Sequence, residues 1–228
     1  MKLAKPIKIN SNLENGGHLS CGVNSIASIL YTLGYSDINL EDLNRDLERL
    51  NKEIEFGGIY QIELLLHILD FISSEYGIDI NYEVKEFSTV DEFREIIKNE
   101  NRYGMVCYYA LQGFIRISKH PSMEHAHFGI VYNYDEKTDT ISGSQSNSKA
   151  DKLKCLENIS IEKFVESCNI VNKLKLNWGK YNKCEINVSK RELENMPRCG
   201  DKNCKLGLCS TSRCIYKPTI GNKIILIG

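Results

Sequence analysis

The apolar residues of this 228-residue chain change their spacing near Gly77. Before that point they recur every three or four positions, which is the period of an amphipathic helix. After it, short segments alternate apolar and polar residues or form brief apolar runs, as strands do. Helices therefore dominate the first half and strands the second. This order predicts an α+β fold, with a helical N-terminal half packed on an antiparallel sheet from the C-terminal half, rather than repeated βα units.

The periodicity and the turn residues place the individual elements. The expected helices are 21–33, 40–50, 59–76, 89–99 and 161–167. The expected strands are 78–84, 105–110, 127–134, 139–144, 185–188 and 223–227. Ser88 or Thr89 is the expected cap of the fourth helix. A chain of this length can bury one core, so we expect a single domain over 1–228 with a cysteine-rich insertion at about 199–214.

Cys21 lies where a polar loop meets the first predicted helix. Ser20 is a residue type that caps helix N-termini, and Val23 and Ile26 begin the apolar spacing of the helix. The helix dipole and the free backbone N–H groups at such an end stabilise a thiolate over a thiol. Cys21 is therefore a candidate nucleophile. The alternative is a small buried core residue, as free cysteines usually are.

A nucleophilic cysteine needs a base, which is usually a histidine. His127 opens a predicted strand, from which its side chain could enter a cleft. The next strand, 139–144, pairs back across a hairpin and brings an amide, Gln145 or Asn147, toward His127. Such an amide would fix the tautomer and orientation of the imidazole. His125 and His127 could instead bind a metal, but no third ligand lies at an obvious spacing.

Two motifs of the sequence, in this order, resemble motifs of a known superfamily. Cys21-Gly22 opens an early helix, and the segment His127-Phe128-Gly129 follows about a hundred residues later. This pattern, over residues 10 to 150, resembles the papain-like cysteine peptidases. The resemblance implies the papain-like fold, with Cys21 as nucleophile, His127 as base and Gln145 as the group that orients the base, and no cofactor for catalysis.

A closer resemblance is to the actin maturation proteases, small cytosolic papain-like enzymes that trim the N-terminus of actin. It rests on an alanine-histidine-aromatic motif at 126–128, a glutamine-containing segment at 143–148, and a short apolar strand near 221–226. The aromatic residue is Phe128, where that family has tryptophan. The resemblance implies a protein or peptide substrate, such as the actin N-terminus, and N-terminal processing as the reaction.

Papain-like enzymes also place an amide side chain shortly before the cysteine. Together with the backbone N–H of the cysteine, it stabilises the oxyanion formed during attack. No glutamine precedes Cys21. Asn15 lies six residues before Cys21 and is the candidate for this role, with Asn12 as the second choice. Asn15-Gly16 could equally form a simple turn.

Four of the nine cysteines lie close together near the C-terminus. They are Cys199, Cys204, Cys209 and Cys214, each five residues from the next. Four thiolates suit a structural zinc ion or an iron–sulfur centre, although the spacing is not the Cys-x-x-Cys pair typical of zinc sites. A structural zinc is therefore one expectation. A cysteine-rich surface insertion without a bound metal is the other.

The overall composition excludes some classes of partner. A net charge of −1 gives no basic footprint for nucleic acid, and no apolar stretch is long enough to cross a membrane. Met1–Asn10 contains lysines but no apolar segment typical of a signal peptide. We therefore expect a cytoplasmic protein in a reducing compartment, where cysteines remain thiols or bind metals.

Three functions remain open from the sequence. The first is a thiol peptidase that forms an acyl-enzyme on Cys21. The second keeps this nucleophile but transfers the acyl group to an amine or hydrolyses a side-chain amide, because papain-like folds host such reactions too. Bacteriocin-leader peptidases share the Cys and His-aromatic pattern, although they normally belong to a membrane transporter. The third is an inactive peptidase scaffold that acts as a metal-stapled interaction module.

Overall fold

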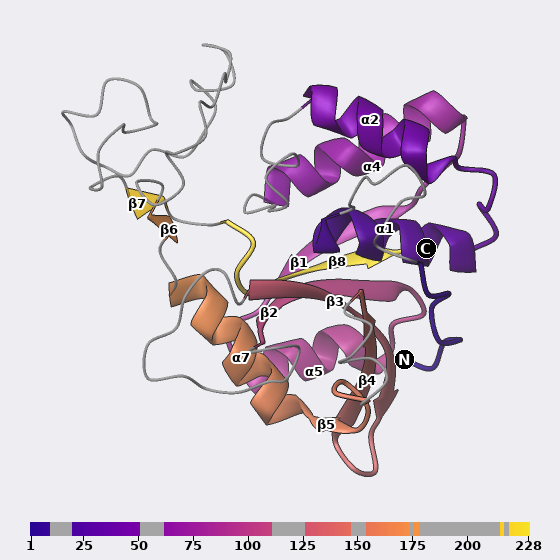
Figure 1. Ribbon diagram of the computed structural model, residues 1–228. Helices are drawn as coiled ribbons and strands as arrows, with labels where there is room; N and C mark the ends of the chain where they lie inside the picture. Colours follow the sequence, from indigo (N-terminus) through magenta and orange to yellow (C-terminus); the bar gives the residue numbers. More distant parts are fainter. Residues whose placement is uncertain are drawn as a thin grey trace.

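The computed structural model describes eight segments of the chain (Figure 1). They are residues 1–9, 20–50, 62–110, 126–146, 154–173, 176–177, 215–216 and 219–228. The helices in these segments are α1 (Cys21–Thr32), α2 (Leu40–Leu50), α4 (Ile62–Tyr76), α5 (Val90–Lys98) and α7 (Ile161–Lys173). The strands are β1 (Tyr82–Glu86), β2 (Tyr103–Tyr109), β3 (Ala126–Asp135), β4 (Thr140–Gln145), β5 (Ile159–Ser160), β6 (Leu176–Asn177), β7 (Ile215–Tyr216) and β8 (Lys223–Ile227).

Six of these strands form one antiparallel sheet in the order β1-β8-β2-β3-β4-β5, and β6 pairs with β7 separately. Strand β8 comes from the far end of the chain and lies between β1 and β2. Strands β2 and β3 pair along most of their lengths, from Gly104 opposite Val131 to Tyr109 opposite Ala126. Because β3 and β4 are joined by a short hairpin, residues from β2, β3 and β4 lie side by side in the middle of the sheet.

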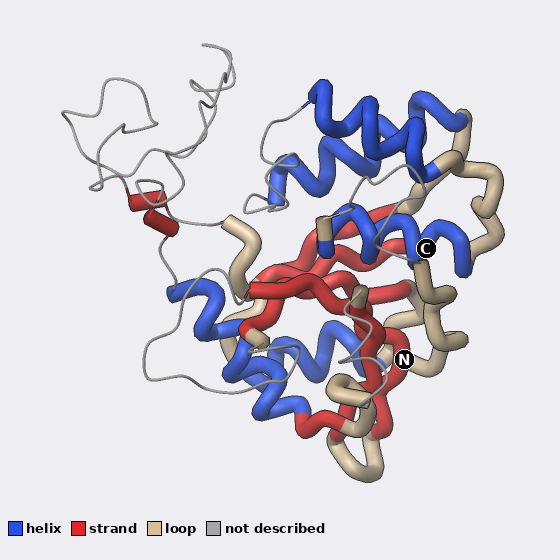
Figure 2. The backbone as a smooth tube through the Cα atoms, in the orientation of Figure 1, coloured by secondary structure: helices blue, strands red, loops and turns tan. Residues whose placement is uncertain are grey.

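Helices cover both faces of the sheet (Figures 1 and 2). Strand β2 is buried along its whole length, and its side chains alternate between two cores. Met105 and Cys107 pack with the core formed by α1, α2 and α4. Val106 and Tyr108 pack with the core formed by α5 and α7. The continuous apolar sequence of β2 is therefore typical of a strand covered on both faces.

The helix ends follow from local sequence. Thr89 caps α5 in a capping box: its side chain accepts from the Glu92 N–H at 3.2 Å, and the Glu92 carboxylate accepts from the Thr89 N–H at 3.0 Å. At the end of α4, Gly77 has a φ of 62°, and the Ile78 N–H donates to the Ser73 carbonyl at 3.1 Å. Ile78 therefore closes α4 and does not begin a strand.

The mixed α+β class expected from the sequence is confirmed, with five helices and a six-stranded antiparallel sheet in the described segments. The division into a helical half and a strand half is only approximate, because β1 and β2 come from the first half and α7 from the second. The expected strand 78–84 is displaced to β1, and the expected helix 161–167 continues to Lys173 because Cys168 and Val171 extend its buried face. The expected strand 185–188 lies outside the described residues.

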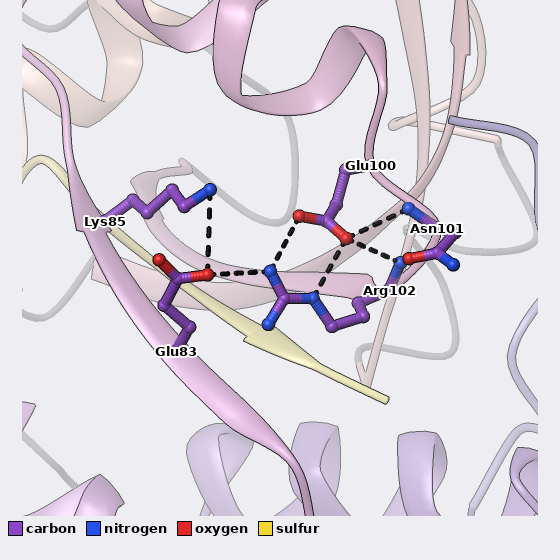
Figure 3. A network of polar contacts seen from close by, with 5 residues as sticks. All are labelled: Glu83, Lys85, Glu100, Asn101 and Arg102. Carbon is purple, nitrogen blue, oxygen red and sulfur yellow. Dashed lines mark hydrogen bonds and ion pairs between the residues drawn. The ribbon is translucent and has the colours of Figure 1, made fainter.

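Ion pairs connect β1 to the start of β2 across the end of β8 (Figure 3). The Arg102 guanidinium donates two hydrogen bonds to the Glu100 carboxylate, from Nε and from Nη2, both at 2.9 Å. Its Nη2 also donates to Glu83 Oε2 on β1 at 2.7 Å, and Lys85 Nζ lies 3.6 Å from the same oxygen. This network ties two strands that do not pair with each other.

None of the described helices combines the length and the apolar character that crossing a bilayer would require.

Candidate active site

The N-terminus of α1 presents Cys21 as its first residue. Ser20 is the N-cap: its side chain accepts from the Val23 N–H at 3.3 Å, and its carbonyl accepts from the Asn24 N–H at 2.8 Å. The predicted cap is therefore confirmed. Helix α1 packs against β3, so its first turn meets the strand that carries His127. Cys21 as a whole residue is partly buried.

The surroundings of Cys21 favour its thiolate. Loss of hydration is the largest influence and by itself raises the pKa of the Cys21 thiol. The charge of His127, a side-chain hydrogen bond with His127, and backbone hydrogen bonds from Phe128 and Gly22 act in the opposite direction. Their combined effect is larger, so the pKa of Cys21 is lowered from its ordinary value.

His127 shows the complementary shift. It lies near the start of β3, where it pairs directly opposite Tyr108 on β2. Loss of hydration by itself lowers the pKa of His127, but the charge and hydrogen bond of Cys21, together with a hydrogen bond to Gln145, raise it overall. A thiol with a lowered pKa beside an imidazole with a raised pKa favours the thiolate–imidazolium pair. Such a pair is the reactive form of a cysteine nucleophile with its base.

Gln145 ends strand β4 and pairs opposite Gly129 on β3. Because His127 and Gly129 are two residues apart, Gln145 and His127 project from the same face of the sheet. Gln145 lies close enough to His127 to raise its pKa, yet the buried His127 Nε2 has no partner at full hydrogen-bond geometry in the described part of the chain. The amide therefore lies near the ring without being aligned with Nε2. Catalytic hydrogen bonds are often long before substrate binds.

The structure thus brings together Cys21, His127 and Gln145, three of the residues singled out in the sequence. Asn15, the candidate oxyanion donor, and the alternatives Asn12 and Asn147 lie outside the described residues. So do His125 and the four cysteines proposed as metal ligands, which are Cys199, Cys204, Cys209 and Cys214. Among the residues that are described, no group of three potential metal ligands occurs.

Two of the three other described cysteines, Cys107 and Cys168, differ clearly from Cys21. Cys107 on β2 is 2% exposed and Cys168 on α7 is fully buried, so both are core residues. Burial raises the pKa of both thiols. Neither therefore competes with Cys21 as a nucleophile at neutral pH.

Two contributors to this site were missed in the sequence analysis. The backbone N–H of Phe128 donates to the Cys21 thiol, and no side-chain pattern could indicate it. The Tyr108 hydroxyl donates to Gln145 Oε1 at 3.1 Å. Tyr108 is part of an apolar run, so it was assigned only to a strand. Its role depends on the register of β2 against β3, which the sequence does not encode locally.

A scan against protein-family models and a search of curated proteins both found no match to this chain. The chemistry of the molecule is therefore inferred from the residues of its site and not from relatives.

Proposed function

We propose that this protein is a thiol peptidase of the papain-like type, in which Cys21 is the nucleophile and His127 the general base and acid. The observation that carries the proposal is the side-chain contact of Cys21, the first residue of α1, with His127, which lowers the pKa of Cys21 and raises the pKa of His127. Desolvation alone would shift both groups the other way. Their mutual interaction outweighs this effect, and it favours the thiolate–imidazolium pair.

The reaction follows from the positions of these groups. The Cys21 thiolate attacks the carbonyl carbon of a peptide bond, and the C–N bond then breaks as His127 gives its proton to the departing amine. The product is a thioester on Cys21. A water molecule then attacks the thioester carbonyl while His127 takes a proton from that water. The C–S bond breaks, the carboxylic acid product leaves, and the Cys21 thiolate is regenerated. Gln145 would keep the imidazole oriented through both proton transfers.

The oxyanion needs donors near the attacked carbonyl. The backbone N–H of Cys21 lies in the first turn of α1, where N–H groups have no partner within the helix. It is the first proposed donor, and Asn15 is the proposed second donor. Acyl transfer to an amine and hydrolysis of a side-chain amide would use the same nucleophile and base, so product analysis must separate them from peptide hydrolysis.

The proposal is tested by alkylation and by product analysis. Iodoacetamide is added to the native protein at pH 6, and peptide mapping by mass spectrometry measures the rate at each cysteine. We expect Cys21 to react faster than every other cysteine, and Cys21→Ser to abolish this fast phase. A Cys21 that reacts no faster than the others would contradict the proposal.

The substrate class is tested separately with N-terminal actin peptides and a mixed peptide library. We expect new peptide termini that appear with the wild type and not with Cys21→Ser. Cleavage of actin peptides alone would support N-terminal processing of actin. Release of ammonia or formation of a new amide, without new termini, would show that the same site performs deamidation or acyl transfer and not peptide hydrolysis.

A further inference from the structure

Tyr108 reaches Gln145 across an intervening strand. Tyr108 lies on β2 and Gln145 on β4, with β3 between them. The Tyr108 hydroxyl nevertheless donates to Gln145 Oε1 at 3.1 Å. Tyr108 is fully buried and Gln145 is 4% exposed, so this hydrogen bond is sheltered from water. A side-chain hydrogen bond that spans three strands needs an unobstructed path over the central one.

Gly129 provides that path. It pairs with Val106 on β2 and with Gln145 on β4, so it occupies the position on β3 that the Tyr108 ring crosses. A Cβ atom at Gly129 would lie 2.9 Å from Tyr108 Cε1 and 3.1 Å from Leu156 Cδ1. Real Cβ atoms essentially never come within 3.0 Å of such an atom, so a larger residue at Gly129 would require the Tyr108 ring to shift. The absent side chain is therefore what lets the hydroxyl reach β4.

The same ring also contacts the proposed base. Tyr108 and His127 are directly opposite each other, with ring centroids 6.1 Å apart and an interplanar angle of 77°. Phe164 of α7 packs on Tyr108 with centroids 5.7 Å apart. The edge-to-face arrangement of the Tyr108 and His127 rings is favourable. Tyr108 therefore touches both His127 and Gln145, while Phe164 restrains it from the helix layer.

We propose that Tyr108 is a positioning residue, whose hydroxyl passes over Gly129 and holds the Gln145 amide against His127. This inference rests on the proposed function, because the role of Gln145 is to orient the base. With Oε1 held by the Tyr108 hydroxyl, the amide oxygen keeps a second acceptor site for the His127 ring. Burial raises the pKa of Tyr108 well above its ordinary value, so the hydroxyl remains a donor at every pH where the site would operate.

The test is the pH profile of Cys21 alkylation in Tyr108→Phe. This change keeps the ring, its contact with His127 and its contact with Phe164, and removes only the hydroxyl. We expect the midpoint of the profile to move to higher pH, and the rate at pH 6 to fall about tenfold, the equivalent of one hydrogen bond. Tyr103→Phe is the matched control, because Tyr103 is a buried residue of the same strand whose hydroxyl donates to the Ala4 carbonyl at 3.0 Å.

A second pair of variants tests the path over β3. Gly129→Ala should displace the Tyr108 ring and move the midpoint in the same direction as Tyr108→Phe. Gly143→Ala is its control, because a Cβ there would meet the Ile130 carbonyl at 2.9 Å and Leu156 Cδ1 at 3.2 Å, with no contact to Tyr108 among its nearest neighbours. We expect Gly143→Ala to lower the melting temperature without moving the midpoint.

The outcomes separate this inference from the proposed function. A wild type with a low midpoint, unchanged in Tyr108→Phe, would overturn the positioning role and leave Cys21 and His127 as the reactive pair. A wild type whose Cys21 titrates like an ordinary thiol would overturn the proposed function, and the positioning role with it. A shift shared by Tyr103→Phe would assign the effect to stability and also overturn the positioning role.

Discussion

Two groups of interacting ionisable side chains differ in how strongly loss of hydration acts on their pKa values. Cys21 and His127 meet where α1 packs on β3, and loss of hydration is the largest influence on the pKa of each. The second group surrounds Arg102, which directly precedes β2 and reaches β1 across the end of β8 (Figure 3). Its outer members, Glu83 and Lys85, remain 48% and 37% exposed. For Glu100 and Arg102, hydrogen bonds between the side chains influence the pKa values more than loss of hydration does.

This difference indicates where a single substitution has chemical consequences. Water and salt screen exposed charges, so an exposed ion pair contributes little to stability. In surroundings of low polarity, each charge depends on its partner, and removal of one changes the protonation of the other. We therefore expect substitutions near Cys21 to change reactivity, and substitutions near Arg102 to change only stability.

The largest effect is expected from His127→Ala. This change removes the charge and the hydrogen bond that lower the pKa of Cys21, and leaves the thiol with the cost of desolvation. The alkylation rate of Cys21 at pH 6 should fall by about 100-fold or more, within the range that a positioned base contributes. Peptide mapping after timed exposure to iodoacetamide measures this rate.

His67→Ala is the matched control for that substitution. His67 is an exposed residue of α4, so its removal should leave the Cys21 rate unchanged. If Cys21 in His127→Ala is alkylated as fast as in the wild type, then His127 does not control the reactivity of the thiol.

A smaller effect on reactivity is expected from Gln145→Ala. Gln145 raises the pKa of His127, so its loss weakens the imidazolium and, through it, the Cys21 thiolate. Because the folded-state pKa of Cys21 lies below its ordinary value of about 8.5, alkylation in the wild type rises at a correspondingly low pH. In the variant that rise should move to higher pH, with a loss of about tenfold at pH 6.

Gln145→Ala also leaves the buried Tyr108 hydroxyl without this acceptor, so the free energy of unfolding should fall by about 1 to 3 kcal/mol. Ser142→Ala is the control, because Ser142 is another buried polar residue of β4. A stability loss in Gln145→Ala without any change in the pH profile would show that Gln145 is structural and does not orient His127.

The parts of the fold that depend on local sequence, such as helix caps and apolar spacing, could be predicted. The cap Ser20 and the apolar spacing of α1 determine the position of the thiol at a helix N-terminus. The cap Thr89 determines the start of α5 in the same way. Strand β8 was also expected over 223–227, but its place between β1 and β2 was not. Pairing between distant segments depends on the packing of the whole sheet, and the apolar pattern of one strand does not specify its neighbours.

The residues of the candidate site could likewise be predicted where residue type or local sequence identifies them, and not where they depend on pairing between distant segments. Cys21 and His127 were identified because nucleophile and base are distinctive residue types, and Gln145 because a short hairpin brings β4 back along β3. Tyr108 could not be identified, since its contact with Gln145 requires both the β2–β3 register and the small size of Gly129. An apolar strand sequence indicates burial, and it does not indicate what a hydroxyl on that strand contacts.

In the Arg102 network, the larger effect is expected from Arg102→Leu. This change removes the paired hydrogen bonds to Glu100, whose side chain is 8% exposed. The free energy of unfolding at pH 7 and low salt should fall by about 1 kcal/mol, a modest loss because Arg102 itself contacts solvent. Urea unfolding measures it, and Arg45→Leu, at an exposed pair with Asp42, is the control.

The pH dependence of this loss has a definite sign. The hydrogen bond from Arg102 is the main reason why the pKa of Glu100 is lowered. Its stabilising contribution is therefore fully present above the ordinary glutamate value of about 4.3, and is lost as the pH falls through the lowered value. The difference between wild type and Arg102→Leu should shrink as the pH falls below about 4. A difference that grows in acid would contradict this assignment.

The smallest effect is expected from Lys85→Ala. Lys85 Nζ lies 3.6 Å from Glu83 Oε2, beyond a good hydrogen bond, and both side chains are exposed. Arg102 already donates to the same carboxylate oxygen at 2.7 Å, so Glu83 keeps its stronger partner. The urea midpoint should not change measurably at low or high salt. If Lys85→Ala were as destabilising as Arg102→Leu, exposure to solvent would not determine the strength of these pairs. The difference between the Cys21–His127 pair and the Arg102 network would then come only from the reactivity of the thiol.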